Sequence, residues 1–176
     1  MGKYFNELQR TMEWLGQKED TVFIGQTVGC PGTFMYPTLE KVPESKRLEF
    51  PVAESFQMQF SIGVALTGKT VISVYPRQNF LLLATADMVN TLDKIVEISH
   101  GEINPHVIIR VATGPDKPVH PGHQHIGNYA EGFIHMFDMI PVFEINSADE
   151  VLDIYETAYH ISGPSLVIEH GNLYNE

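Results

Sequence analysis

The sequence of 176 residues has little cysteine, little positive charge and no long apolar run. Its one cysteine cannot form a disulfide within the chain, so nothing points to an oxidising compartment. Eleven Lys and Arg stand against twenty-two Asp and Glu, which gives a formal net charge of −11. Phosphate backbones and anionic lipids repel such a chain, so we expect neither nucleic acid nor membrane surfaces as partners.

Several familiar segments and motifs are also missing. The longest apolar stretch, Phe80 to Ala86, is far shorter than a bilayer span, and no secretory signal opens the chain. We therefore expect a soluble, cytoplasmic protein. There is no G-x-G-x-x-G, Walker loop, G-x-S-x-G or H-E-x-x-H motif, which argues against the common nucleotide-binding, serine-hydrolase and zinc-protease sites. Cys30 stands in the turn sequence Gly-Cys-Pro-Gly, and a lone cysteine is more often a packing residue than a nucleophile.

The composition is that of a folded globular chain. Hydrophobic residues make up 43% of the sequence and charged residues 19%, which argues against disorder. At this length about 70% of the unfolded chain's surface is buried on folding, so the core requires neither disulfides nor a structural metal. No repeat, low-complexity tract or linker divides the sequence. We expect residues 1–176 to form one domain.

Short apolar runs alternate with helical patterns along the chain. The predicted strands are 22–25, 47–50, 70–75, 107–111, 142–145 and 165–169, and the predicted helices are 3–19, 54–66, 80–98, 129–137 and 149–161, with Ser147 as the N-cap of the last. Residues 26–45 are expected to form a loop with a short helical turn, and residues 113–126 a Gly/Pro/His loop. This order predicts an α/β fold, a single three-layer domain with a mainly parallel sheet of about six strands and helices on both faces. Ligands bind such sheets beyond the carboxyl ends of the strands.

The segment Glu49-Phe-Pro-Val-Ala-Glu54 ends a predicted strand and opens a helix that contains Gly63 and Ala65. Elementary physics accounts for this pattern without a function, because a carboxylate is favoured in the first turn of a helix and small residues allow close packing. Pro51-Val-Ala-Glu54 and the small residues after it nevertheless resemble the pyrimidine-binding domain of thiamine-diphosphate enzymes. The likeness is to the transketolase-like group, and above all to the beta subunit of the 2-oxoacid dehydrogenase decarboxylating component.

Further motifs of that family follow in the same order over residues 20–176. They are Phe80 with Val89-Asn90 and Lys94 beyond it, Val107-Ile-Ile-Arg110, Gln124-His125, Ile140-Pro141-Val142, Glu169-His170 and Leu173-Tyr174. Each motif is short, and their order makes the resemblance fairly specific.

The resemblance implies a role for three residues. Glu54 would hydrogen-bond the pyrimidine ring nitrogen N1′ of thiamine diphosphate and favour its imino tautomer, which requires a protonated carboxyl in part of the cycle. Phe80 would stack on the pyrimidine face. His125 would lie at the mouth of the site, as a donor or proton shuttle near the substrate. The cofactor would stabilise the carbanion left when a 2-oxo acid loses carbon dioxide.

Each of these residues also has a plainer interpretation. Phe80 starts an apolar helical pattern, and without the resemblance such a residue is more often part of the core. His120, His123 and His125 suit an exposed loop, or a zinc or copper site, although no neighbouring cysteine or carboxylate completes a tetrahedral set.

The chain departs from the family pattern at single positions and in extent. Gln59 replaces a glycine, Ala86 an acidic residue (with Asp87 beside it) and Ile126 a serine, changes that bear on substrate and rate more than on cofactor binding. The sequence also lacks the Gly-Asp-Gly…Asn element that holds diphosphate through magnesium, and it stops at Glu176, where the family's beta subunits continue into a further domain.

The resemblance therefore implies half of a cofactor site, inactive alone and completed by a diphosphate- and magnesium-binding alpha-type subunit across a large apolar interface. A homodimer or heterotetramer would provide this interface. The expected reaction is decarboxylation of a 2-oxo acid or transfer of its two-carbon unit. Two alternatives stay open. One is a non-catalytic, degenerate copy that serves as a scaffold or regulatory subunit, and the other is a metal-binding protein built on the His120–His125 loop.

Overall fold

The computed structural model describes residues 2–175, in which six strands form one sheet. The strands are β1 (Thr21–Gly25), β2 (Arg47–Glu49), β3 (Thr70–Tyr75), β4 (Val107–Thr113), β5 (Val142–Ile145) and β6 (Ser165–His170). They lie in the order β2-β1-β3-β4-β6-β5, and every neighbouring pair is parallel. The predicted parallel α/β sheet is confirmed, and each expected strand is present.

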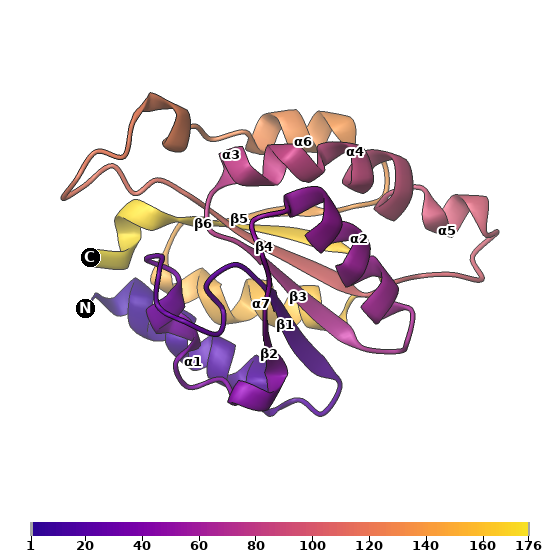
Figure 1. The fold of residues 1–176 in the computed structure, drawn as a ribbon, viewed down its shortest axis with the longest axis horizontal. Coiled ribbons are helices and arrows are strands. Elements are labelled where there is room, and N and C mark those ends of the chain that lie inside the picture. The colour runs from indigo at the N-terminus through magenta and orange to yellow at the C-terminus, as the bar shows by residue number, and fades with distance from the viewer. Residues whose placement is uncertain (1, 176) are drawn as a thin grey trace.

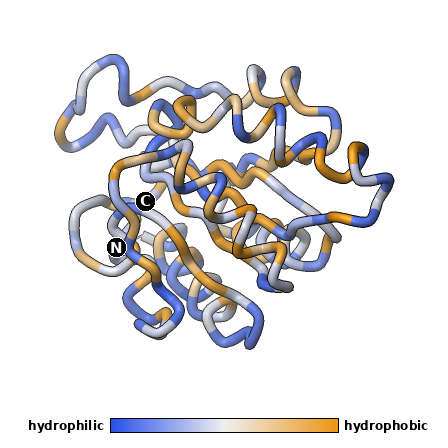
Figure 2. Tube along the Cα trace, turned by 45° about the vertical axis from the view of Figure 1, so that its right-hand side comes forward, coloured by the Kyte–Doolittle hydropathy of each residue, from blue (hydrophilic) through white to orange (hydrophobic). Residues whose placement is uncertain are grey.

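Helices cover both faces of the sheet and make the three layers visible in Figure 1. Helices α1 (Lys3–Gln17) and α7 (Val151–His160) lie on one face. Helices α2 (Glu54–Ala65), α3 (Gln78–Leu81), α4 (Thr85–Asp87) and α6 (Ala130–Met136) lie over the other, with α5 (Ile95–Ile98) beyond α4. Hydrophobic and hydrophilic residues alternate along the helices (Figure 2), as expected where one side of each helix meets the sheet.

The two faces carry separate hydrophobic cores because side chains alternate across a strand. In β4, which is buried throughout, Ile108 and Ala112 join the core under α1 and α7, whereas Ile109 and Val111 join the core under α2 and α6. Strands β3 and β4 are buried along their whole length, as expected of parallel strands covered on both sides. The edge strand β2 is more exposed.

The prediction of one continuous helix over 80–98 is wrong. The segment divides into α3, a 3-10 turn (Leu82–Ala84), α4, a π-helical turn (Met88–Leu92) and α5. The irregular turns lead to Asp93, whose fully buried carboxylate accepts hydrogen bonds from the backbone N–H groups of Asp138, Met139 and Ile140. These partners lie about 45 residues away in sequence, so local periodicity could not indicate the break.

Three smaller expectations also need correction. The last predicted helix begins with a 3-10 turn (Ala148–Glu150), and the Ser147 side chain makes no capping hydrogen bond. Instead, the carboxylate of Glu150 accepts the backbone N–H of Asn146. The loop 26–45 contains two 3-10 turns, Tyr36–Leu39 and Glu44–Lys46, instead of one. Cys30 is exposed, so its interpretation as a packing residue is wrong.

Within residues 2–175, none of the helices combines the length and the apolarity that crossing a bilayer would take.

Candidate functional site

The candidate site lies at the carboxyl edge of the sheet, where the strand order changes direction. The chain runs from β1 to β2 on one side and then returns to β3 on the other side of β1. Loops that leave neighbouring strands diverge at such a point, and ligands of open parallel sheets bind there. Gln26 follows β1, and Pro76 and Arg77 follow β3.

Glu54 is the first residue of α2 and is buried, with 4% of its surface exposed. Gln26, itself buried, donates from Nε2 to Oε1 of Glu54 over 3.0 Å. The Tyr75 hydroxyl, at the end of β3, donates to the Glu54 backbone carbonyl over 3.3 Å. Oε2 of Glu54 has no hydrogen-bond partner within residues 2–175. The site thus contains a largely desolvated carboxyl group with one oxygen held and one available to a ligand.

A second buried amide ties the start of α2 to the sheet. Gln57 donates from Nε2 to the Val74 carbonyl over 3.0 Å and lies 3.3 Å from the Ser73 hydroxyl. Ser61, one turn further along α2, donates to the same Ser73 hydroxyl over 2.9 Å. These bonds fix α2 against β3, and therefore fix the position of Glu54.

Phe80 and His125 lie together although 45 residues separate them. Their ring centroids are 5.5 Å apart at an interplanar angle of 52°. Asn79 Oδ1 lies 3.1 Å from His125 Nδ1, which orients the imidazole. Phe80 is partly exposed in α3 and stays outside both hydrophobic cores, so the interpretation of Phe80 as a core residue is wrong.

Arg77 is the residue that sequence reasoning missed. Its guanidinium Nη1 donates to the carbonyls of Gly114 and His125, and the group lies 5.4 Å from the ring centroid of Phe34. Burial lowers the pKa of Arg77. A basic residue two positions after a buried strand was the available signal, because that position faces the ligand edge of a parallel sheet.

A cavity of about 380 Å³ lies beside these residues, and Phe34, Arg77 and Phe80 are among its lining. Glu54 and His125 are not in that lining. The fold thus joins Phe80 to His125 and Arg77, whereas the Glu54 backbone is bonded to Tyr75, which precedes Arg77 by two residues. Within residues 2–175, Glu54 makes no hydrogen bond to His125.

The histidine loop has one close pair. The rings of His120 and His123 are 5.2 Å apart, and His120 Nδ1 accepts the backbone N–H of Gly122. No group of three His, Cys, Asp or Glu side chains in the described part of the chain is arranged to hold a metal ion.

Three of the motif residues form a buried network on the α1 and α7 side of the sheet. Arg110 in β4 donates from Nε to Glu169 Oε1 over 2.8 Å and from Nη2 to Glu169 Oε2 over 3.0 Å. Tyr155 and Tyr174 donate their hydroxyls to the same carboxylate. Burial, followed by the Glu169 charge, raises the pKa of both tyrosines well above the ordinary value. Arg110, Glu169 and Tyr174 therefore stabilise the fold and do not face the candidate site.

Two other motif positions also have structural partners. Lys94 forms ion pairs with Asp93, at 2.9 Å, and with Asp138. Gln59, which stands where the family has glycine, donates from Nε2 to Asp87 Oδ1 over 2.8 Å. Gln59 and Asp87, the residues at or beside two departures from the family pattern, thus bond to each other and link α2 to α4.

The surface around Glu54 is apolar. Val52, just before α2, is 77% exposed, and Phe56, in the first turn of α2, is 60% exposed. Leu83 lies in the 3-10 turn that packs against α2 and is 65% exposed. Large apolar side chains exposed in this way are typical of interaction surfaces.

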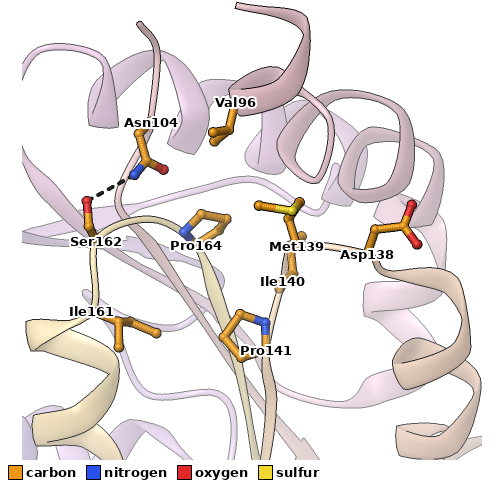
Figure 3. Close-up of a pocket in the computed structure, with 9 residues that line it drawn as sticks. All are labelled: Val96, Asn104, Asp138, Met139, Ile140, Pro141, Ile161, Ser162 and Pro164. Atoms are coloured by element: carbon orange, nitrogen blue, oxygen red, sulfur yellow. Dashed lines mark hydrogen bonds between the residues drawn. The ribbon is translucent and has the colours of Figure 1, made fainter. Parts of the chain in front are cut away.

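A larger cavity, of about 460 Å³, lies at the opposite edge of the sheet (Figure 3). Pro141 and Pro164, which directly precede β5 and β6, line it together with Met139 and Val96. Its hydrogen bond runs from Asn104 Nδ2 to Ser162 Oγ over 3.0 Å. Asp138 is the single titratable side chain of its lining, so this cavity offers little chemistry.

Comparison with known proteins agrees with the family motifs. No protein-family model matches the chain. It is 27% identical over 169 residues to the pyruvate dehydrogenase E1 component subunit beta of Cyanidium caldarium, which covers 93% of this chain and 50% of that protein. It is 25% identical over 175 residues to the subunit of the same name from Gracilaria tenuistipitata var. liui, which covers 97% and 53%. The chain spans about half the length of these curated relatives.

Two solved structures share the fold. A split-gene transketolase, solved as an inactive beta4 tetramer, superposes with a TM-score of 0.71 at 16% identity, over 93% of this chain and 49% of that one. Transketolase from Campylobacter jejuni superposes with a TM-score of 0.70 at 12% identity, over 94% and 25%. Through its ordered motifs, its sequence relatives and its three-layer fold, the chain resembles the pyrimidine-binding domain of thiamine-diphosphate enzymes of the transketolase-like group.

Proposed function

We propose that residues 1–176 act as the pyrimidine-binding part of a thiamine-diphosphate enzyme divided between chains, and that the enzyme acts on 2-oxo acids. The observation that carries the proposal is the buried Glu54 carboxyl with Oε2 free at the ligand edge of the sheet. A carboxyl in this place can form a hydrogen bond with a ring nitrogen through Oε2 while Gln26 fixes its other oxygen.

The residues fit the pyrimidine end of the cofactor. Phe80 offers a partly exposed ring beside a cavity, as stacking on a planar heterocycle requires. His125, oriented by Asn79, lies against Phe80 and can donate or accept a proton there. When bound, thiamine diphosphate supplies the carbanion-stabilising chemistry, and this chain's residues orient the ring and exclude water.

The proposal includes an alpha-type partner that holds the diphosphate and magnesium. The exposed apolar side chains of Val52, Phe56 and Leu83 around Glu54 support such a partner, because burying them would also enclose the site. The sequence relatives are beta subunits by name, which favours the same assignment. A heterotetramer or a homodimer would bring the two halves together.

The Arg110–Glu169 network gives one reason to keep a second candidate function. These family motifs serve folding in this chain, so a copy without catalytic activity would retain them as well. Such a copy would act as a scaffold or regulatory subunit and would not need to bind the cofactor.

Substitution of Glu54 separates the two functions. In the assembled enzyme, Glu54→Gln should remove most thiamine-dependent turnover of 2-oxo acids and leave assembly intact, because the amide cannot carry the proton. Ser55→Ala, at an exposed neighbouring position, is the matched control. Near-normal turnover of the Glu54 variant would contradict the catalytic assignment, and an assembled complex that binds no cofactor would favour the scaffold.

A further inference from the structure

The lining of the cavity beside Phe80 is positively charged, which is unusual for this acidic protein. The chain carries twice as many acidic as basic residues, yet Arg77 is the one charged side chain of the cavity lining. The rest of the lining consists of the two aromatic residues Phe34 and Phe80, two prolines, a glycine and a threonine. This is a small, partly apolar space with a cation at its wall.

The Arg77 side chain is held in place, and none of the carboxylates in residues 2–175 pairs with it. Its Nη1 is occupied by the carbonyls of Gly114 and His125, and the guanidinium lies over the ring of Phe34. Nε and Nη2 make no hydrogen bond, and Arg77 forms no ion pair, with any of residues 2–175. Arg110, by contrast, is fully buried and has its carboxylate partner in Glu169. Arg77 is therefore a half-buried cation with two free donors.

A guanidinium in this state favours one class of ligand. Its planar fork pairs with the two oxygens of a carboxylate, and exclusion of water strengthens the pair. The ring of Phe80 and the cavity's proline residues offer apolar contact to a short carbon skeleton. A neutral ligand would leave the fork unsatisfied, and a bare inorganic anion would leave the apolar walls unused.

We propose that Arg77 binds the carboxylate of a small organic acid whose carbon skeleton occupies the cavity between Phe34 and Phe80. The identity of this acid as the 2-oxo acid substrate rests on the proposed function, whereas binding of the carboxylate itself does not. Arg77 is then a substrate-binding residue. It also donates a hydrogen bond to the backbone carbonyl of His125, 48 residues later in the sequence. The carboxylate would lie close to both His125 and Phe80.

Titration of the full chain followed by NMR tests the binding directly. Pyruvate should give saturable shifts at Phe80 and His125, and uncharged pyruvamide should bind about tenfold more weakly or worse, because one charge-assisted interaction is lost. Arg77→Gln should weaken pyruvate binding by about tenfold or more, whereas Lys117→Gln, at an exposed basic position two residues after Pro115 of the cavity lining, should not change it.

Three results would overturn the assignment. The first is equal weakening by the Arg77 and Lys117 variants, which would mean general charge attraction. The second is equal binding of pyruvate and pyruvamide. The third is inorganic phosphate binding more tightly than pyruvate, which would mean a phosphate-bearing ligand. Because Arg77→Gln removes two hydrogen bonds to the loop after β4, at Gly114 and His125, Arg77→Lys is the second variant. It retains the charge and one donor, so it should fold and bind pyruvate with intermediate affinity.

The same variants separate this proposal from the proposed function. Glu54→Gln should bind pyruvate as the unmodified chain does. Pyruvate binding at Arg77 without thiamine-dependent turnover in the assembled enzyme would refute the proposed function alone. If turnover depends on Glu54 but Arg77→Gln leaves the KM for the 2-oxo acid unchanged, the Arg77 assignment alone is refuted.

Discussion

Gln26, in the loop after β1, and Glu54, the first residue of α2, meet at the ligand edge of the sheet through a buried hydrogen bond of 3.0 Å. Water has little access to the Gln26 amide and to Glu54 Oε1, because both residues are buried. The bond therefore links the fold to the candidate site: it positions the carboxyl and leaves its second oxygen free.

Removing the Gln26 donor should destabilise the chain. Gln26→Met leaves a buried carboxyl oxygen without a partner, so the free energy of unfolding should fall by about 1–3 kcal/mol. Urea unfolding measures the change, with the exposed Gln17→Met as the matched control. A variant as stable as the unmodified chain would mean that water replaces the amide and that Gln26 does not hold Glu54.

The Arg110–Glu169 pair should tolerate joint replacement better than single replacement. Arg110→Met leaves the Glu169 carboxylate buried without its cation, and we expect a loss of about 3–5 kcal/mol. The double variant Arg110→Met with Glu169→Met should lose less than the sum of the two single losses. The exposed Arg10, paired with Glu7, is the control, and Arg10→Met should cost less than about 1 kcal/mol. Additive losses in the buried pair would contradict the coupling.

Asp93 should make the stability of the chain depend on pH. Burial raises the pKa of Asp93, but the hydrogen bonds from Lys94 and from the backbone N–H groups of Met139, Asp138 and Ile140 outweigh burial, so the pKa lies below its ordinary value. A lowered pKa in the folded chain stabilises the fold above about pH 4, and this contribution is lost as the pH falls through the folded value.

Asp93→Asn is the corresponding test. The variant should be less stable at neutral pH by about 1–3 kcal/mol, because an amide oxygen is a poorer acceptor for three N–H groups. Its stability should also fall less steeply than that of the unmodified chain when urea unfolding is repeated from about pH 6 down to pH 3. Parallel pH profiles for the two chains would assign the acid sensitivity to other carboxylates.

The apolar surface around Glu54 should mediate binding of the partner. Phe56→Glu should weaken association with the alpha-type subunit by more than about tenfold while the isolated chain keeps its stability. Ile98→Glu, which changes a similarly exposed apolar residue on α5, should leave association unchanged. Sedimentation of the mixed subunits provides the measurement. Equal effects of both substitutions would place the interface elsewhere.

Local pattern was sufficient for most of the architecture and for the position of Glu54. The β-branched run Thr70–Tyr75 and the proline and carboxylate before α2 specify a strand and a helix start through contacts within a few residues. Alternation of such elements then predicts the parallel sheet and its ligand edge. The family motifs in order led to the resemblance, although Arg110, Glu169 and Tyr174 lie in a buried network away from the candidate site.

Only the tertiary structure decided which distant residues meet. The break in the helix after Phe80 depends on backbone groups near Met139, and the pairing of Gln59 with Asp87 depends on how α2 crosses α4. Arg77 gained its importance in the same way, from carbonyls and a ring supplied by two other loops. Sequence periodicity reports which face of an element is apolar, because that face must be buried. It carries no information on which polar groups share an edge, because the packing of the whole chain brings them together.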